Sequence, residues 1–337
     1  MRRIVLKATI DRRPVAADFK LVEAGRPTCP ENGVVARVLY LSLDPYVGSR
    51  LRGRHMGEAP PRPMLDAIPG AIVGVIVESR APGLCEGDLI QSMEGAWAEY
   101  VALESHACRR IDPRAAPLSA HLGPLGMPGL TAWAGVSRLA CVDSGETFLV
   151  DAAAGAVGGA AGQIARILGA GKVVGIAGGE VKLRLVEREY GFDAGVDYKS
   201  PDWRAALADA LGEGLDVFFE NVSTEMAMIA LSHARPYARG VLCGLAAHYQ
   251  DTERSAHALN AGLIIAKRAR LMGLVVYDFY HCWDEFAAMA TDWVRDGRLK
   301  VAEDRAKGLE GAPALFEKLM AGRNVGKCIV AVDGEPS

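Results

Sequence analysis

Residues 152–165 read AAAGAVGGAAGQIA, a run of small side chains that follows the apolar segment TFLV at residues 147–150. Two kinds of structure produce such a run. One is a dinucleotide-binding turn, in which glycines after a strand let the backbone approach a pyrophosphate at the start of a helix. The other is a helix of small residues that packs closely on its neighbours. The segments on either side of the run decide between them.

Apolar, strand-like runs alternate with helix-length segments around this stretch. They lie at residues 148–150, 173–176, 195–197, 216–219, 240–243 and 271–276. This alternation predicts a parallel, doubly wound sheet with strand order 3-2-1-4-5-6 and helices on both faces. A strand before the small-residue run, a helix after it and the next strand at the expected distance favour the cofactor site.

Within that site, residues 153–158 match the dinucleotide fingerprint G-x-G-x-x-G, with Ala in the first position. Gly155 would let the backbone approach the pyrophosphate, and Gly158 would let the helix pack closely on the strand. The amides of Ala156 and Val157 then face the phosphates at the positive end of the helix dipole.

The first third of the chain follows a different pattern. Short β-rich runs at residues 34–40, 71–78, 88–91 and 97–103 are separated by Gly and Pro, as in a small all-β barrel. Residues 312–321 predict a short helix, and residues 327–332 predict a final strand that returns to the barrel. We therefore expect an α/β protein with a barrel domain at residues 1–122 and 300–337 and a dinucleotide-binding domain at residues 123–299.

Composition narrows the class of partner. A chain of 337 residues with a net charge of −3 has no basic surface that would suit nucleic acid or an anionic membrane. The longest uncharged stretch, residues 115–137, contains three prolines and four glycines, which break any spanning helix. The seven cysteines form no CxxC motif, and the N-terminus lacks the apolar segment of a secretory signal. These features predict a soluble cytoplasmic protein.

The second strand of the predicted sheet bears on which cofactor binds. NAD-selective sites place Asp or Glu at its end to hold the ribose 2′-hydroxyl, whereas this chain has Ala177 and Gly178. Lys182 and Tyr198 follow close by and could reach a 2′-phosphate, so we expect NADPH. Glu180 also lies nearby, and its carboxylate could instead accept a hydrogen bond from the ribose 2′-hydroxyl of NAD.

Asn221, at the end of the fourth strand, faces the nicotinamide half of such a site, although Asn at a strand end is often only a turn former.

Along nearly its whole length the chain resembles the zinc-independent medium-chain reductases, which include the prostaglandin reductases and the bacterial curcumin reductases. The segments that carry the resemblance are LYLSLDPY (39–46), LGMPGLTAWAGV (125–136), AAAGAVGGAAGQIA (152–165), VVGIAGGEVK (173–182), GFDAGVDYKS (191–200), DVFFENVS (216–223) and GRNVGKCIV (322–330). The resemblance implies a GroES-like barrel plus a Rossmann domain, NADPH as cofactor, and reduction of a carbon–carbon double bond conjugated to a carbonyl.

The resemblance also implies roles for individual residues. Lys182 and Tyr198 match the contacts to the 2′-phosphate, and Tyr249 matches a tyrosine in the loop after the fifth strand. The remaining cofactor-binding positions that it implies are Met127, Thr131, Asn221, Gly244, Tyr277 and Asn324.

Departures from the family pattern bear on the substrate more than on the cofactor. They are VGSRLRGRH at residues 47–55, the segment at residues 61–70, and Asp151 where Ser or Thr often precedes the glycines. No metal site is expected. The zinc enzymes of this superfamily place Cys and Gly-His-Glu where this chain has LSLD (41–44) and PGAIVG (69–74), and no Cys or His lies at ligand spacing from His55, His106 or His121.

Conjugate reduction needs a hydride for the β-carbon, a donor for the enolate oxygen and a proton for the α-carbon. The phenols of Tyr249 and Tyr46 are the candidate donors, because tyrosine stays protonated at neutral pH. Quinone reduction, oxidation of a secondary alcohol and a non-catalytic NADPH sensor are the alternatives. The strand at residues 271–276 lies at the edge of the predicted sheet and could pair across a two-fold axis, which predicts a homodimer.

Overall fold

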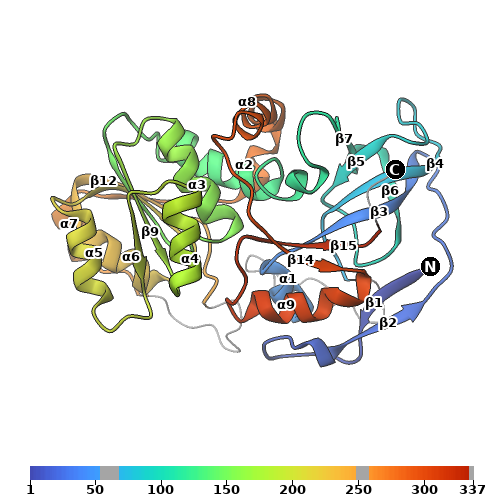
Figure 1. The fold of residues 1–337 in the computed structure, drawn as a ribbon, viewed down its shortest axis with the longest axis horizontal. Coiled ribbons are helices and arrows are strands. Elements are labelled where there is room, and N and C mark those ends of the chain that lie inside the picture. Colours follow the sequence, from blue (N-terminus) through green and yellow to red (C-terminus); the bar gives the residue numbers. More distant parts are fainter. Residues whose placement is uncertain (54–67, 248–257, 334–337) are drawn as a thin grey trace. The chain divides into compact units, whose positions relative to one another are not determined.

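The computed structural model describes residues 1–53, 68–247 and 258–333. These residues form two compact units. The first contains Met1–Leu122 and Glu303–Ser337, and the second contains Gly123–His248 and Glu253–Ala302, within the described residues (Figure 1). No helix in the described ranges combines the length and the apolar character that a membrane span requires.

The second unit is built on a six-stranded parallel sheet. Its strands run in the order β10 (Ala194–Asp197), β9 (Lys172–Ala177), β8 (Thr147–Val150), β11 (Leu215–Glu220), β12 (Ala234–Leu242), β13 (Arg270–Gly273). This order is 3-2-1-4-5-6 in chain sequence, which confirms the doubly wound fold. The chain order reverses between β8 and β11, so ligands of such folds bind at the carboxyl ends of these two strands.

Helices flank this sheet. They are α2 (Met127–Trp133), α3 (Ala156–Ile167), α4 (Glu180–Arg184), α5 (Trp203–Leu211), α6 (Thr224–Ser232), α7 (Ala261–Lys267) and α8 (Trp283–Arg295). Alternate strand residues serve the two faces: Val174 and Ile176 join the core formed with α5 and α6. Gly175 points to the other face, where a methyl group would lie 2.8 Å from Ala153, just before α3. The central strands β8, β9 and β11 are therefore buried on both faces, as their continuous apolar runs predict.

The first unit contains a seven-stranded mixed sheet and a separate two-stranded sheet. The larger sheet runs β14 (Glu303–Lys307), β15 (Lys327–Ala331), β3 (Gly33–Leu43), β4 (Ile72–Ser79), β5 (Leu89–Ser92), β7 (Arg109–Arg110), with β6 (Tyr100–Glu104) also paired to β3; the smaller joins β1 (Arg2–Leu6) to β2 (Phe19–Glu23). Among the described residues, the α-helices of this unit are α1 (Tyr46–Leu51) and α9 (Ala312–Met320).

The C-terminal strand returns to the first unit, as predicted, because β15 pairs antiparallel with β3. It does not return alone: β14 lies parallel beside it. The sequence EDRAK of β14 is mostly charged and partly exposed, so it lacks the apolar alternation by which strands are recognised. β13 also ends earlier than predicted, at Gly273, because a 3₁₀ helix occupies Val276–Cys282.

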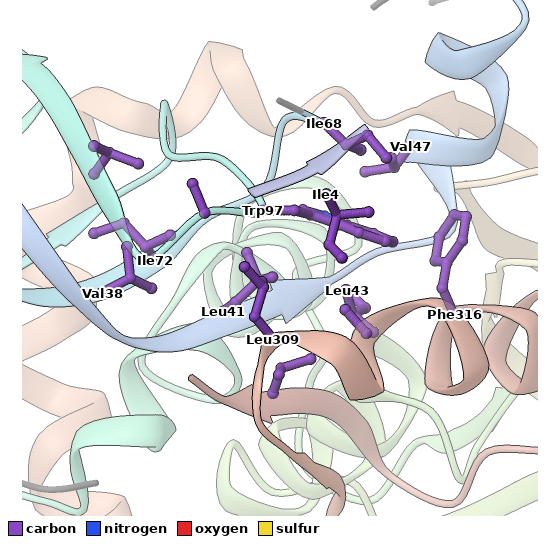
Figure 2. Packing of buried hydrophobic residues seen from close by; sticks show 14 of the residues in the cluster. Ile4, Val38, Leu41, Leu43, Val47, Ile68, Ile72, Trp97, Leu309 and Phe316 are labelled. Atoms are coloured by element: carbon purple, nitrogen blue, oxygen red, sulfur yellow. The ribbon is translucent and has the colours of Figure 1, made fainter. Parts of the chain in front are cut away.

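Figure 2 shows the core of the first unit, in which strands from both ends of the chain meet. The Trp97 ring lies 5.2 Å from that of Phe316, on α9, in an edge-to-face arrangement. The Trp97 ring also stacks on the ring of Phe19, with the two ring centres 5.5 Å apart. Each of these fully packed aromatics contributes several kcal/mol of apolar burial, at about 25 cal/mol per Å², so the C-terminal helix is an integral part of this unit.

Candidate cofactor site

The small-residue run folds as a turn followed by a helix. β8 ends at Val150, and α3 begins at Ala156 with Gly155 as its N-cap. The first amides of an α-helix have no partner within the helix. In α3 no side chain caps them either. Gly155, Ala156 and Val157 are all partly exposed. The start of α3 can therefore receive an anion through its backbone N–H groups and its dipole.

The glycines of the run divide into two groups. A methyl group on Gly158 would lie 2.5 Å from the carbonyl oxygen of Ala152 and 2.7 Å from that of Asp151, so only glycine fits against this turn. Methyl groups on Gly159 and Gly162 would instead meet the rings of Tyr190 at 2.6 Å and Phe192 at 2.0 Å. Both interpretations of the run thus apply, since its beginning can cradle a phosphate and its remainder packs closely on neighbours.

Gln163, near the end of the run, has a structural role that the sequence did not indicate. Its amide oxygen accepts from the N–H of Lys300 at 2.7 Å, and its Nε2 donates to the carbonyl of Gly159 at 3.1 Å. The side chain is buried. It therefore ties α3 to the segment that follows α8, far away in the sequence.

The ends of β9 and β10 bring together most of the residues predicted to select NADPH. The Tyr198 N–H donates to the carbonyl of Ala177 at 3.2 Å, and a methyl group on Gly178 would lie 2.7 Å from the Tyr198 ring. Tyr198 is 48% exposed and therefore available to a ligand. Lys182 lies in α4, which starts directly after this turn.

Neighbouring charges shape the same turn. The Asp197 carboxylate accepts from the N–H groups of Gly179 and Lys199, both at 3.0 Å. The ammonium of Lys199 lies 6.0 Å from the centre of the Tyr198 ring and adds a cation that sequence reasoning missed. Glu180, the alternative ribose ligand, pairs with Arg184 at 2.9 Å. This turn therefore carries an exposed phenol, that of Tyr198, with the Lys199 ammonium beside it.

Two buried carboxyl groups lie at the switch point of the sheet. Asp151 follows β8 and is 4% exposed, and Glu220 ends β11 and is 3% exposed. Asp151 Oδ1 accepts from the backbone N–H of Asn221 at 2.7 Å and from its Nδ2 at 3.3 Å. The amide nitrogen of Asn221 is thus held by Asp151, which leaves the amide oxygen to accept a hydrogen bond from a ligand.

The other predicted cofactor residues of this unit lie on α2 and after β12 and β13. Met127 begins α2. The Thr131 hydroxyl donates its proton to the Met127 carbonyl at 2.7 Å, so the lone pairs of the hydroxyl oxygen can accept a hydrogen bond from a ligand. The Gly244 N–H donates to the Glu220 carbonyl at 3.3 Å, which places Gly244 beside the switch point. Tyr277 is 48% exposed and contacts Tyr280 edge to face.

In the first unit, Tyr46 begins α1 and packs, half-buried, on the core. The residues just before it are held by a buried ion pair between Asp44 and Lys327, whose side chains are 8% and 4% exposed. Lys327 also donates to the Leu43 carbonyl at 3.0 Å. This pair joins two of the segments that carry the family resemblance. Asn324, close to Lys327, is buried and donates to the Gly326 carbonyl at 2.9 Å.

Tyr249 and His55 lie outside the described residues. Within the described ranges, no group of three or more His, Cys, Asp or Glu side chains is arranged to hold a metal ion. His121 is buried, and burial lowers the pKa of its imidazole to about 4.

A doubly wound sheet with a glycine turn at its switch point, in one chain with a mixed β-sheet unit, is the architecture expected of a dinucleotide-dependent oxidoreductase. Two family models agree: "N-terminal domain of oxidoreductase" matches residues 2–111, and "Zinc-binding dehydrogenase" matches residues 156–294. The chain is 36% identical to the 2-alkenal reductase (NADP(+)-dependent) of Nicotiana tabacum, covering 99% of this chain and 98% of that protein. The chain belongs to the medium-chain dehydrogenase/reductase family, in the group of the curcumin and prostaglandin reductases.

Two further relatives support this placement. The NADPH-dependent curcumin reductase of Escherichia coli K12 is 34% identical over 99% of this chain and 97% of its own length. The crystal structure of CurA in complex with NADPH from Vibrio vulnificus superposes with a TM-score of 0.90 at 31% identity, covering 100% of both chains. The first unit is thus the GroES-like domain and the second the Rossmann domain of this family.

Proposed function

We propose that this protein uses NADPH to reduce the carbon–carbon double bond of α,β-unsaturated ketones or aldehydes. The observation that carries the proposal is the full-length likeness to reductases whose names specify NADP(H) and alkenal or curcumin substrates. The geometry agrees with it. The turn around Gly178 presents cations and the Tyr198 phenol where NAD-selective sites present a carboxylate.

Each part of the Rossmann unit has a task in this reaction. The amides at the start of α3 hold the pyrophosphate, and Lys182, Tyr198 and Lys199 hold the 2′-phosphate. Asn221, with Met127, Thr131, Gly244 and Tyr277, orients the nicotinamide half. Asn324, which belongs to the GroES-like unit, is a further cofactor contact in this proposal. NADPH supplies the hydride for the β-carbon. A tyrosine hydroxyl, from Tyr249 or Tyr46, donates to the carbonyl oxygen as negative charge develops there, and a proton completes the α-carbon.

The proposed activity is tested by following NADPH oxidation with an alkenal, a long-chain enone and a quinone, and by identifying the products. We expect turnover of the first two, with two hydrogens added across the double bond and the carbonyl retained. Turnover of the quinone alone would contradict the proposal. Tight NADPH binding without turnover of any acceptor would instead indicate a sensor.

The cofactor preference depends on the 2′-phosphate contacts. We expect Lys182→Ala to lower the preference for NADPH over NADH at least ~10-fold, because a hydrogen bond to a charged group contributes ~1.5–3 kcal/mol. The measurement is kcat/KM with each cofactor. Arg188→Ala, which removes an exposed positive charge just beyond α4, is the matched control and should leave the ratio unchanged. An unchanged ratio in Lys182→Ala would remove this residue from the phosphate site.

The two candidate donors are separated by removing one hydroxyl at a time. We expect Tyr249→Phe to lower kcat at least ~10-fold, since a positioned acid contributes ~10²–10⁴-fold, while the Kd for NADPH changes little. Tyr46→Phe is the matched variant from the GroES-like unit. If Tyr249→Phe turns over at the wild-type rate and Tyr46→Phe does not, the donor is Tyr46.

Three further features belong to the same proposal. We propose a reaction without zinc, because residues 41–44 and 69–74 lack the Cys and Gly-His-Glu ligands of the zinc enzymes. We propose a homodimer formed through β13, one of the two edge strands of the parallel sheet; a solution mass of twice 35.8 kDa would support it. A cytoplasmic location fits the seven cysteines, all of which are free thiols.

A further inference from the structure

The inference concerns Asp197, the last residue of β10, whose side chain joins two segments of the chain. Its Oδ1 atom accepts from the N–H of Gly179, which follows β9, and from the N–H of Lys199, both at 3.0 Å. Asp197 lies opposite Ala177 in the parallel pairing of β10 with β9, so its carboxylate is at the carboxyl ends of both strands. It therefore fastens the turn after β9 to the segment after β10.

The two residues that follow Asp197 lie against one glycine of this turn. A methyl group on Gly178 would lie 2.7 Å from the Tyr198 ring and 2.9 Å from Cε of Lys199. Asp197 holds the backbone of Gly179 on one side of this contact and that of Lys199 on the other. Its two hydrogen bonds thus fix where the phenol and the lysine side chain meet the turn.

Asp197 also brings a negative charge to the turn. Its side chain is partly exposed, and both of its hydrogen bonds come from neutral backbone N–H groups. Among the described residues, no Lys or Arg side chain forms an ion pair with it. The nearby Glu180, in contrast, pairs with Arg184 and is 80% exposed, where solvent and salt screen its charge.

The end of β9 is the place where a doubly wound fold binds the adenosine ribose. NAD-selective enzymes hold the ribose 2′-hydroxyl there with a carboxylate, whereas NADP-selective enzymes accommodate the 2′-phosphate with a cation. In this protein β9 ends at Ala177, and Gly179, the amide partner of Asp197, comes two residues later. A 2′-phosphate held by this turn would share it with a carboxylate, and like charges repel each other.

We propose that Asp197 is a specificity-determining residue for the cofactor: its Oδ1 atom holds the 2′-phosphate site together, and its negative charge limits the preference of that site for NADPH over NADH. The inference rests on the assignment of the 2′-phosphate to this turn in the proposed function. The two effects oppose each other, because the hydrogen bonds organise the phosphate ligands and the charge repels the phosphate. A neutral side chain with the same oxygen separates them.

The test compares two substitutions of this residue. Asp197→Asn keeps an oxygen for the N–H groups of Gly179 and Lys199 and removes the charge, whereas Asp197→Ala removes the charge and both hydrogen bonds. The difference between wild type and Asp197→Asn therefore measures the charge, and the difference between the two variants measures the hydrogen bonds. Dissociation constants for NADPH and NADH are measured by calorimetry in the absence of substrate.

We expect Asp197→Asn to raise the ratio of the NADH to the NADPH dissociation constant at least ~3-fold, which corresponds to about 0.7 kcal/mol. Asp197→Ala should bind NADPH at least ~5-fold more weakly than Asp197→Asn, because the turn loses both hydrogen bonds. A ratio in Asp197→Asn equal to or below that of wild type would overturn the effect of the charge. Equal NADPH affinity in the two variants would overturn the role of the hydrogen bonds.

Glu187→Gln is the matched control for the loss of a charge. Glu187 Oε1 accepts from the N–H of Gly195 at 2.9 Å, so this carboxylate also binds the backbone of β10, two residues before Asp197. The same change from carboxylate to amide should there leave the ratio of the dissociation constants within about twofold of wild type. A shift as large as that of Asp197→Asn would indicate an effect of net charge and overturn the specific role of Asp197.

Folding and the proposed function are checked separately. Should Asp197→Ala lack the circular dichroism of wild type, Asp197→Ser, whose shorter side chain cannot span both N–H groups, takes its place. If wild type binds NADPH no better than NADH and Lys182→Ala leaves the ratio unchanged, the assignment of the 2′-phosphate to this turn is wrong, and the inference with it. If Lys182→Ala lowers the ratio while Asp197→Asn keeps that of wild type, only the inference is wrong.

Discussion

Lys327→Met is expected to lower the free energy of unfolding by about 3–5 kcal/mol, because removing one partner of a buried ion pair leaves the other charge unpaired. The ammonium of Lys327 is 4% exposed and pairs with Asp44, which also accepts from the Ser42 hydroxyl. After the substitution the Asp44 carboxylate would remain buried, with its charge balanced by no cation among the described residues and with the Ser42 hydroxyl still donating to it. Urea unfolding followed by circular dichroism measures the effect.

Lys318 provides the matched control. It forms an ion pair with Asp304 at 2.6 Å, but its side chain is 42% exposed. Exposed pairs contribute only ~0–1 kcal/mol, so Lys318→Met should cost correspondingly little. Combining Lys327→Met with Asp44→Asn should recover part of the loss, because it removes the orphaned charge. Equal losses for the Lys327 and Lys318 variants would show that the buried pair is not a stabilising contact of the GroES-like unit.

The second large effect is expected at Gly158. We predict that Gly158→Ala weakens NADPH binding at least ~30-fold, about 2 kcal/mol. The added methyl group would lie 2.5 Å from the Ala152 carbonyl oxygen, and backbone cannot rotate away as a side chain can. The turn at residues 151–155 would have to move, and with it the amides at the start of α3 that receive the pyrophosphate. Fluorescence titration with NADPH measures the loss.

Gly159→Ala is the matched control, because it adds the same methyl group one residue further along α3. There the methyl group would meet the ring of Tyr190 at 2.6 Å, whereas the backbone atom it approaches, the carbonyl oxygen of Ala153, lies at 3.2 Å. We expect a loss of stability of ~1–3 kcal/mol from overpacking and an NADPH affinity within a few-fold of wild type. If the two variants bind NADPH equally well, the turn is not the phosphate site.

Local sequence patterns accounted for the scaffold of the site. Apolar runs at strand spacing predicted the order of the parallel sheet, because a strand buried on both faces must be apolar throughout. The turn after β8 and the absence of a carboxylate at Ala177 and Gly178 were equally readable, since each depends on a few consecutive residues. The same patterns did not reveal β14, because its sequence EDRAK is mostly charged and lacks an apolar run.

The contacts that give the site its individual character were decided only by the tertiary structure. Asp151 and Glu220 meet because two parallel strands lie in register, and Lys327 meets Asp44 across the pairing of β15 with β3. In the sequence, each of these residues is an ordinary charged side chain at the end of a strand. Its partner, its burial and its proton are set by residues that are remote along the chain. The sequence alone therefore predicted that a dinucleotide binds, and the folded chain decided which charged side chains are buried together.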